Sequence, residues 1–147
     1  MPDLTELSAF FVRHYMLCGG WMVVTVLLIA VQIRLLFSNV RRTTPSGATL
    51  MVNREEGVFV DVRSLDNYKQ GHITNSLSIT LSEIRNGRLQ RLERSRDKPV
   101  IVVGKDRFDT DSFNSARELK KRGFSRVYVL TGGILEWTDA NLPLTVK

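Results

Sequence analysis

The stretch "PVIVVGKDRFDTDSFNSARELKKRG", residues 99–123, decides the fold of the region around it. It begins with a short apolar run, continues through a nine-residue polar loop (residues 104–112), and ends in a segment with helical spacing. A buried strand that leads through a loop into a helix N-terminus builds anion sites and nucleophile loops in α/β proteins, because the first helical N–H groups point unpaired into the loop. We therefore expect any chemistry of this protein to take place at this loop.

Strand-like and helix-like segments alternate on both sides of this stretch. Apolar runs predict strands at residues 58–63, 77–80, 99–103 and 126–130. Helical spacing and capping residues predict helices at residues 45–54, 64–71, 81–94, 111–122 and 134–141. In the helix at 45–54 we expect Leu50 and Met51 to point inward, and we expect residues 72–76 to form a loop. This order predicts an α/β domain, residues 44–147, with a parallel sheet flanked by helices.

The segment 81–94 carries two sets of side chains at helical spacing. Four apolar side chains are expected to share an inward arc: Leu81, Ile84, Leu89 and Leu92. Four arginines recur every third residue on the outside: Arg85, Arg88, Arg91 and Arg94. We interpret these arginines as a solvated helix face, with contacts to lipid headgroups or to an acidic partner as the functional alternative.

An apolar stretch near the N-terminus predicts a membrane anchor. Eighteen residues from Met16 to Ile33 carry no charge, and as a helix they would be about 27 Å long, close to the thickness of a bilayer core. We predict a transmembrane helix at residues 14–37, a short tail at residues 1–13 and a juxtamembrane linker at residues 38–43. A cleaved signal peptide is disfavoured by the acidic start and the long apolar run, and a buried helix is disfavoured because it is apolar all round.

Basic side chains near this stretch predict its orientation. They gather on its C-terminal side at Arg34, Arg41, Arg42 and Arg54, against Arg13 on the other side. The bulk of the chain is therefore expected in the cytoplasm. The formal charge of +6 lies in the rest of the chain, because the first 37 residues contain two basic and two acidic side chains. Such a domain would be attracted to an anionic membrane surface, and no nucleic-acid-binding module accompanies the charge.

Two further motifs resemble a known family. The segment "FVDVRSLDNYKQGHITNSLSI", residues 59–79, is similar to the first signature of the rhodanese homology domain, and "VYVLTGGILEW", residues 127–137, is similar to its closing signature. The resemblance covers roughly residues 44–144. With one N-terminal span added, the chain resembles the small membrane-anchored rhodanese-like proteins of gammaproteobacteria. The resemblance implies a sulfurtransferase fold on a single-pass anchor in the bacterial inner membrane.

The chain departs from this family at the residue that carries the chemistry. An active rhodanese places a cysteine directly after the strand, because sulfur transfer needs a thiolate that accepts and releases a sulfane sulfur. Here that position falls on Gly104 or Lys105, and the loop is about two residues longer than in the family. The single cysteine, Cys18, lies inside the predicted span. We expect no catalytic residue in this protein.

We interpret the loop as a vestigial active-site loop that has become a recognition surface. Its members are Gly104, Lys105, Asp106, Arg107, Phe108, Asp109, Thr110, Asp111 and Ser112. Thr110 and Ser112 lack a nearby histidine to activate a hydroxyl, and Asp109, Asp111 or Ser112 is expected to cap the following helix. The three aspartates, only partly offset by Lys105 and Arg107, predict weak binding of simple anions.

The remaining polar residues indicate structural roles. Asp61 and Arg63 match a family pair that orders the loops around the active site, and we expect a structural ion pair or loop hydrogen bonds, with substrate contact as the functional alternative. His72 is expected to form structural hydrogen bonds. With His14 as the only other histidine, we expect no metal site, and nothing in the sequence predicts a cofactor.

Three functions fit these observations. The first is an inactive rhodanese-like domain that acts as a protein-binding or regulatory module at the cytoplasmic face of the membrane, with another membrane or membrane-associated protein as partner. The second is a sulfurtransferase-like enzyme or sulfur-relay component that acts on a small anion, with a thiol supplied by a partner. The third is a scaffold whose span binds a partner, for which Gly19 and Gly20 give a weak signal.

Overall fold

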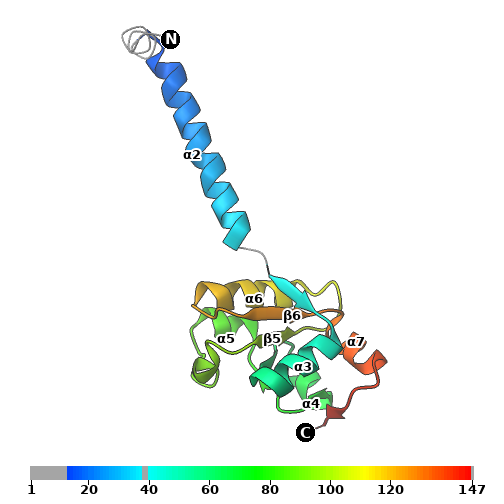
Figure 1. Ribbon diagram of the computed structural model, residues 1–147. Coiled ribbons are helices and arrows are strands. Elements are labelled where there is room, and N and C mark those ends of the chain that lie inside the picture. The colour runs from blue at the N-terminus through cyan, green and yellow to red at the C-terminus, as the bar shows by residue number, and fades with distance from the viewer. Residues whose placement is uncertain (1–12, 38–39, 147) are drawn as a thin grey trace. The chain divides into compact units, whose positions relative to one another are not determined.

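The computed structural model describes residues 13–37 and 40–146 and divides the chain into two units (Figure 1). The first contains helix α2 (Tyr15–Phe37), whose 23 residues make it about 34 Å long. Its first 18 residues have a mean hydropathy of 1.9, so by length and composition this helix can cross a membrane, as predicted. The Thr25 hydroxyl donates a hydrogen bond to the Trp21 carbonyl (2.8 Å), which satisfies this polar group within the helix. The predicted tail at residues 1–13 lies outside the described residues except for Arg13.

The second unit begins at Val40 and is built on a parallel sheet of five strands. Their order across the sheet is β1-β6-β5-β2-β4. The strands are β1 (Arg41–Thr43), β2 (Val58–Asp61), β4 (Leu77–Ser78), β5 (Val100–Val103) and β6 (Val127–Leu130). The two central strands are in register, with Asp61 opposite Val103 at the carboxyl end. This end of a parallel sheet is where open α/β folds place their sites.

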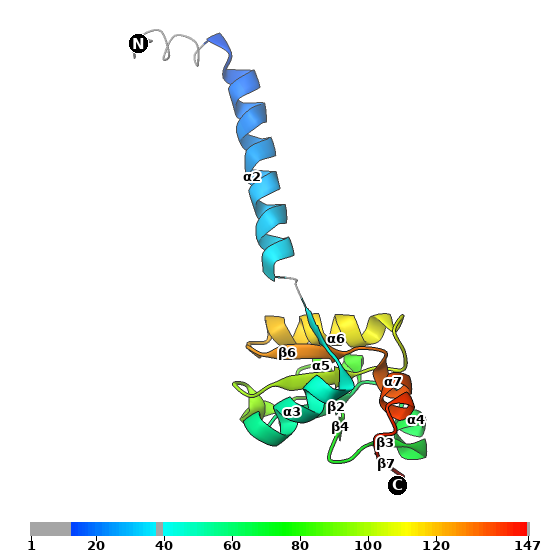
Figure 2. The same cartoon turned by 45° about the vertical axis from the view of Figure 1, so that its right-hand side comes forward.

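Helices cover both faces of the sheet, as predicted (Figure 2). They are α3 (Pro45–Glu55), α4 (Leu65–Gln70), α5 (Leu81–Arg85), the 3-10 helix η1 (Glu93–Ser95), α6 (Thr110–Lys121) and α7 (Gly133–Asp139). Residues of α5 and α6 belong to one buried cluster, and residues of α3 and α7 belong to the other. The domain therefore has the three layers expected when both faces of a parallel sheet are buried.

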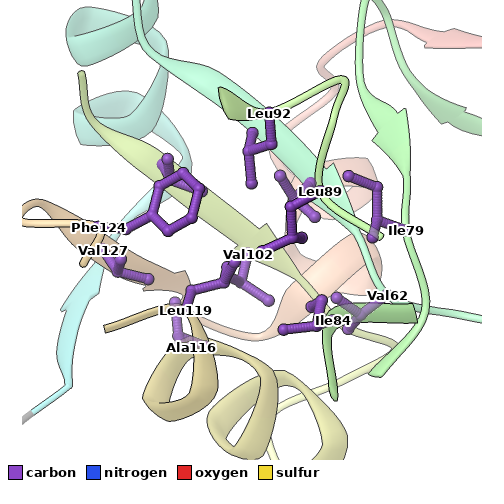
Figure 3. Packing of buried hydrophobic residues seen from close by; sticks show 13 residues of the cluster. Val62, Ile79, Ile84, Leu89, Leu92, Val102, Ala116, Leu119, Phe124 and Val127 are labelled. Carbon is purple, nitrogen blue, oxygen red and sulfur yellow. The ribbon is translucent and has the colours of Figure 1, made fainter. Parts of the chain in front are cut away.

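Strand β5 supplies side chains to both clusters. Val102 packs in one cluster with Leu119 of α6 (Figure 3), and Val100 belongs to the same cluster. Ile101 and Val103 pack in the other cluster. All four strand residues are fully buried. A continuous run of β-branched side chains therefore fits an inner strand that is covered on both faces.

Helix α3 forms where it was predicted, but Leu50 does not point inward. Thr44 caps the helix by accepting a hydrogen bond from the Gly47 N–H, and Pro45 follows at the first helical position. The buried residues are Pro45 and Ala48, whereas Leu50 is 51% exposed. The inward row runs through Ala48 and Val52, four residues apart, and Leu50 lies away from this row.

The helix predicted for residues 81–94 is wrong beyond Arg85. Helix α5 starts with a reciprocal capping pair, Thr80 and Glu83, and is followed by a turn in which Gly87 has a φ of +74°. Ile84, Leu89 and Leu92 are still buried, but turns and η1 position the last two. The four arginines at 85, 88, 91 and 94 are exposed without forming one helix face.

Three short strands lie where the sequence predicted a linker, a loop or no particular element. Strand β1, inside the predicted linker at residues 38–43, pairs with β6 at the edge of the sheet, so the domain extends further toward the N-terminus than residue 44. Strands β3 (His72–Ile73) and β7 (Leu144–Thr145) pair antiparallel with each other. Strands of two or three residues are too short to show an alternating pattern, and their partners are distant in the sequence.

Candidate functional site

The loop between β5 and α6 lies at the carboxyl edge of the sheet. It leaves the buried strand at Gly104 and enters α6 at Thr110. The Ile134 N–H donates a hydrogen bond to the Gly104 carbonyl (3.0 Å), which ties the loop to α7. The structure therefore has the predicted order of strand, loop and helix here and adds α7 as a neighbour of the loop.

Asp109 uses its carboxylate to bind the backbone of its own loop. The Lys105 N–H donates to Oδ2 (3.0 Å) and the Asp111 N–H donates to Oδ1 (3.0 Å). Asp109 is thus the N-cap of α6, which confirms one of the three caps predicted from sequence. The Asp111 N–H belongs to the first turn of α6, where the unpaired N–H groups of a helix can bind an anion.

Two further hydrogen bonds fix the rest of the loop. The Phe108 N–H donates to Oδ1 of Asp106 (2.8 Å), and the Ser112 hydroxyl donates to the Asp109 carbonyl (2.8 Å). Ser112 is 1% exposed. Its hydroxyl is therefore a buried structural group, and the loop backbone is held by its own side chains.

The space above Gly104 is filled by Asp109. A Cβ atom built on Gly104 would stand 2.2 Å from Asp109 Oδ2 and 2.9 Å from Ser112 Cβ. The Asp109 side chain could move aside only by losing the hydrogen bonds that it accepts from the Lys105 and Asp111 N–H groups. The position directly after the strand therefore has no room for a side chain while Asp109 is in place.

The Gly-Gly pair of the closing signature lets α7 approach the loop. Gly133 has a φ of +58°, and a Cβ atom there would stand 2.5 Å from the Gly104 carbonyl oxygen. Gly132 has a φ of +68°, and a Cβ atom there would collide with Glu136. Both positions require glycine, for conformation and for space.

Asp61 and Arg63 form a closed ion pair at the same sheet edge. Arg63 Nε lies 2.9 Å from Asp61 Oδ1, and Arg63 Nη2 lies 2.6 Å from Asp61 Oδ2. Nη2 also donates to the Gly71 carbonyl (2.7 Å), so the pair joins the end of β2 to the end of α4. Asp61 is 1% exposed, so its side chain is buried against this guanidinium.

His72 is a structural residue. Its ring stacks on Tyr68 with ring centres 3.9 Å apart, and Nδ1 lies 2.9 Å from the Tyr68 carbonyl oxygen. The Tyr68 hydroxyl donates to the Ser76 carbonyl (2.7 Å). Within the part of the chain that the structure describes, no group of three or more histidine, cysteine, aspartate or glutamate side chains is arranged to hold a metal ion.

A surface depression lies between the loop and α7. Its lining, which we call the Phe108 depression, consists of Asp106, Arg107, Phe108, Gly132, Leu135, Glu136 and Asp139. The four predicted arginines at 85, 88, 91 and 94 do not line it. Sequence reasoning found the loop half of this surface and missed the α7 half. The signal available was the position of "TGG" directly after a predicted inner strand, which places α7 at the same sheet edge.

The comparison with protein families agrees with this fold and with the two signatures. The model of the rhodanese-like domain matches residues 44–140. The chain belongs to the rhodanese-like domain family, as the sequence predicted.

Two relatives and one solved structure show how far the similarity extends. The chain is 36% identical over 141 residues to the uncharacterized protein YibN from Escherichia coli strain K12, which covers 96% of this chain and 97% of YibN. It is 30% identical over 97 residues to the thiosulfate sulfurtransferase GlpE from Coxiella burnetii strain RSA 331, which covers 62% of this chain and 86% of GlpE. The crystal structure of the BH2092 protein from Bacillus halodurans matches with a TM-score of 0.65 at 25% identity, and the match covers 81% of this chain and 84% of that one.

Proposed function

We propose that this protein is a membrane-anchored rhodanese-like domain that binds a partner and does not transfer sulfur. The observation that carries the proposal is Asp109. Its carboxylate accepts the Lys105 and Asp111 N–H groups and fills the space above Gly104. A persulfide or an anionic substrate would need the same N–H groups and the same space.

The missing thiol supports the same proposal. Cys18 is the single cysteine of the chain and lies within the apolar helix α2. Gly104 and Lys105, the positions at which the family places its nucleophile, offer no sulfur and no side chain activated by a neighbouring base. The loop therefore has a defined shape without a reacting atom.

We place this domain on the cytoplasmic face of the bacterial inner membrane. Helix α2 is long and apolar enough to serve as a single-pass anchor, and the similarity to YibN extends over it. Arg41, Arg42 and Arg54 follow the helix, as expected for a chain that continues into the cytoplasm. The partner is then another membrane or membrane-associated protein.

The other residues singled out from the sequence receive supporting roles in this proposal. Asp61 and Arg63 order the sheet edge beside the loop through their closed ion pair. The exposed arginines contact anionic lipid headgroups; they are Arg85, Arg88, Arg91 and Arg94.

A sulfur-transfer assay tests the proposal against the enzymatic alternative, which the similarity to GlpE favours. The purified full-length chain in nanodiscs is given thiosulfate and cyanide, with and without glutathione as an external thiol, and thiocyanate is measured. We expect no thiocyanate above the protein-free control under either condition, with GlpE as the positive control. Turnover that disappears in Arg63→Lys would support a sulfurtransferase or sulfur-relay function and overturn the proposal.

A further inference from the structure

The Phe108 depression exposes two large apolar side chains. Phe108 is 87% exposed and Leu135 is 54% exposed, and both line the same depression. Leaving side chains of this size in water forgoes the favourable free energy of burying them. Neighbouring exposed apolar side chains with charged groups around them are typical of a surface that another molecule covers.

The backbone presents Phe108 in a fixed position. Its N–H donates to Asp106, and the loop ends on either side are held by Asp109 and by the bond from Ile134 to Gly104. A partner would therefore lose little conformational entropy on the side of this protein when it covers the aromatic ring. Aromatic side chains are prominent among the few residues that carry most of the binding energy of protein interfaces.

The charge around the two apolar side chains is negative. Three carboxylates line the depression (Asp106, Glu136 and Asp139), and Arg107 is the one basic residue of the lining, with Nη2 3.8 Å from Glu136 Oε2. This contrasts with the chain as a whole, which has a formal charge of +6. Asp139 is the last residue of α7, where the helix dipole disfavours a carboxylate. An unfavourable placement of this kind, which lowers the stability of the helix, is expected where a residue is used to bind a partner.

We infer that the Phe108 depression docks a protein segment that combines one large apolar side chain with flanking lysines or arginines. This inference rests on the proposed binding function and specifies the chemistry of the partner. The apolar side chain packs against Phe108 and Leu135, and the basic side chains pair with Glu136 and Asp139. The acidic lining repels anionic lipid headgroups, so the occupant is a protein segment.

A selection from random peptides tests this chemistry. A phage-displayed random peptide library is panned against the full-length protein in zwitterionic nanodiscs, after depletion on empty nanodiscs. Selected peptides are synthesised, and their Kd values are measured by fluorescence anisotropy. We expect a consensus with excess lysine or arginine around one aromatic or aliphatic residue. Affinity should fall about tenfold or more in Phe108→Ser and in Leu135→Gln, and it should weaken as salt rises.

Matched variants separate docking from general surface effects. Leu65 on α4 is 54% exposed like Leu135 but does not line the depression, so Leu65→Gln should leave the Kd unchanged. Asp97 is exposed and lies outside the depression, so Asp97→Asn should have no effect, whereas Asp139→Asn weakens binding.

Several outcomes would overturn the inference. These are a neutral or acidic consensus, binding that Phe108→Ser does not change, or no enrichment in the selection. Self-association of the full-length protein that Phe108→Ser abolishes would assign the depression to a second copy instead. The sulfur-transfer assay on the same preparation judges the proposed function separately, because turnover overturns that proposal whatever the peptides show.

Discussion

The carboxylate of Asp109 occupies the space that a side chain on residue 104 would need, and residue 104 is glycine. A Cβ atom on Gly104 would stand 2.2 Å from Asp109 Oδ2, and that oxygen accepts the Lys105 N–H at 3.0 Å. The loop is therefore closed by its own N-cap. The identity of residue 104 and the identity of residue 109 depend on each other, and this dependence can be measured.

We expect Gly104→Ala and Asp109→Ala to be coupled in stability. The added methyl group of Gly104→Ala overlaps Asp109, which should cost about 1–3 kcal/mol, and Asp109→Ala alone should cost about 1 kcal/mol through loss of the cap. The double variant removes the overlap with the Asp109 carboxylate and keeps only the close approach to Ser112 Cβ, so it should be more stable than the two losses predict. Unfolding of the full-length protein, followed by circular dichroism, measures this double-mutant cycle.

Gly71→Ala is the matched control for this cycle. Gly71 is buried at the end of α4, its backbone is extended, and an added Cβ atom would stand 3.5 Å from Leu144 Cδ1, an ordinary contact. It should lose little stability, with no coupling to Asp109→Ala. Additive losses for Gly104→Ala and Asp109→Ala would show that the two residues do not compete for one volume.

A thiol introduced at residue 104 should become acidic only when Asp109 is removed. In a Cys18→Ser background, Gly104→Cys with Asp109→Ala leaves the Lys105 and Asp111 N–H groups available to a thiolate at the N-terminus of α6. We expect the thiol pKa to fall below its usual value of about 8.5. The pH dependence of alkylation by iodoacetamide measures it. A thiol of ordinary or raised pKa in the double variant would contradict this account of the loop.

The inner strands and the helix after the loop were predictable from local sequence. The run Val100–Val103 is apolar at every position, and α6 follows with Asp109 as its N-cap. The helix predicted over 81–94 is wrong beyond Arg85 because the apolar residues and the arginines both follow helical spacing, whereas Gly87 at positive φ lies in a turn after α5. The pairing of β3 with β7 was not predicted, because each strand has only two residues and therefore no recognisable pattern of its own.

The α7 half of the Phe108 depression could not be predicted from local sequence. Leu135 and Asp139 are four residues apart on α7, and this spacing places them on one side of the helix. Their meeting with Phe108 depends on the order of the strands, since β6 lies next to β5 and both feed the same sheet edge. The sequence predicts the negative charge of the loop, but the hydrogen bonds from its aspartates to its own backbone are seen only in the structure.

Replacing Arg63 should destabilise the domain more than replacing the whole ion pair. Arg63→Met leaves the buried carboxyl group of Asp61, which is 1% exposed, without its guanidinium partner, and this should cost about 3–5 kcal/mol. Asp61→Asn combined with Arg63→Met removes the buried charge and should recover part of this loss. Chemical unfolding of the three full-length proteins measures the difference. A double variant as unstable as Arg63→Met would show that the buried charge is not the cause.

Acid should weaken the edge of the domain opposite the loop. Lys98 Nζ lies 2.5 Å from Glu56 Oε2, and this hydrogen bond, helped by the charge of Lys98, lowers the pKa of Glu56 below its ordinary value of 4.5. A hydrogen bond from Arg96 likewise lowers the pKa of Glu93. A carboxyl group with a lowered folded pKa contributes stability above its unfolded pKa and loses it as the pH falls through the folded pKa.

We therefore expect the stability of the full-length protein to fall below about pH 4.5, and part of this fall to depend on Glu56. Glu56→Gln should flatten the pH dependence of the unfolding midpoint in this window and leave its slope above pH 6 unchanged. Lys98→Met should have the same effect, because it removes the donor that lowers the pKa of Glu56. Glu56 is 79% exposed and Lys98 is 41% exposed, so the effect on stability should be small and should shrink in high salt. An unchanged acid slope in both variants would show that this ion pair does not contribute to folding stability.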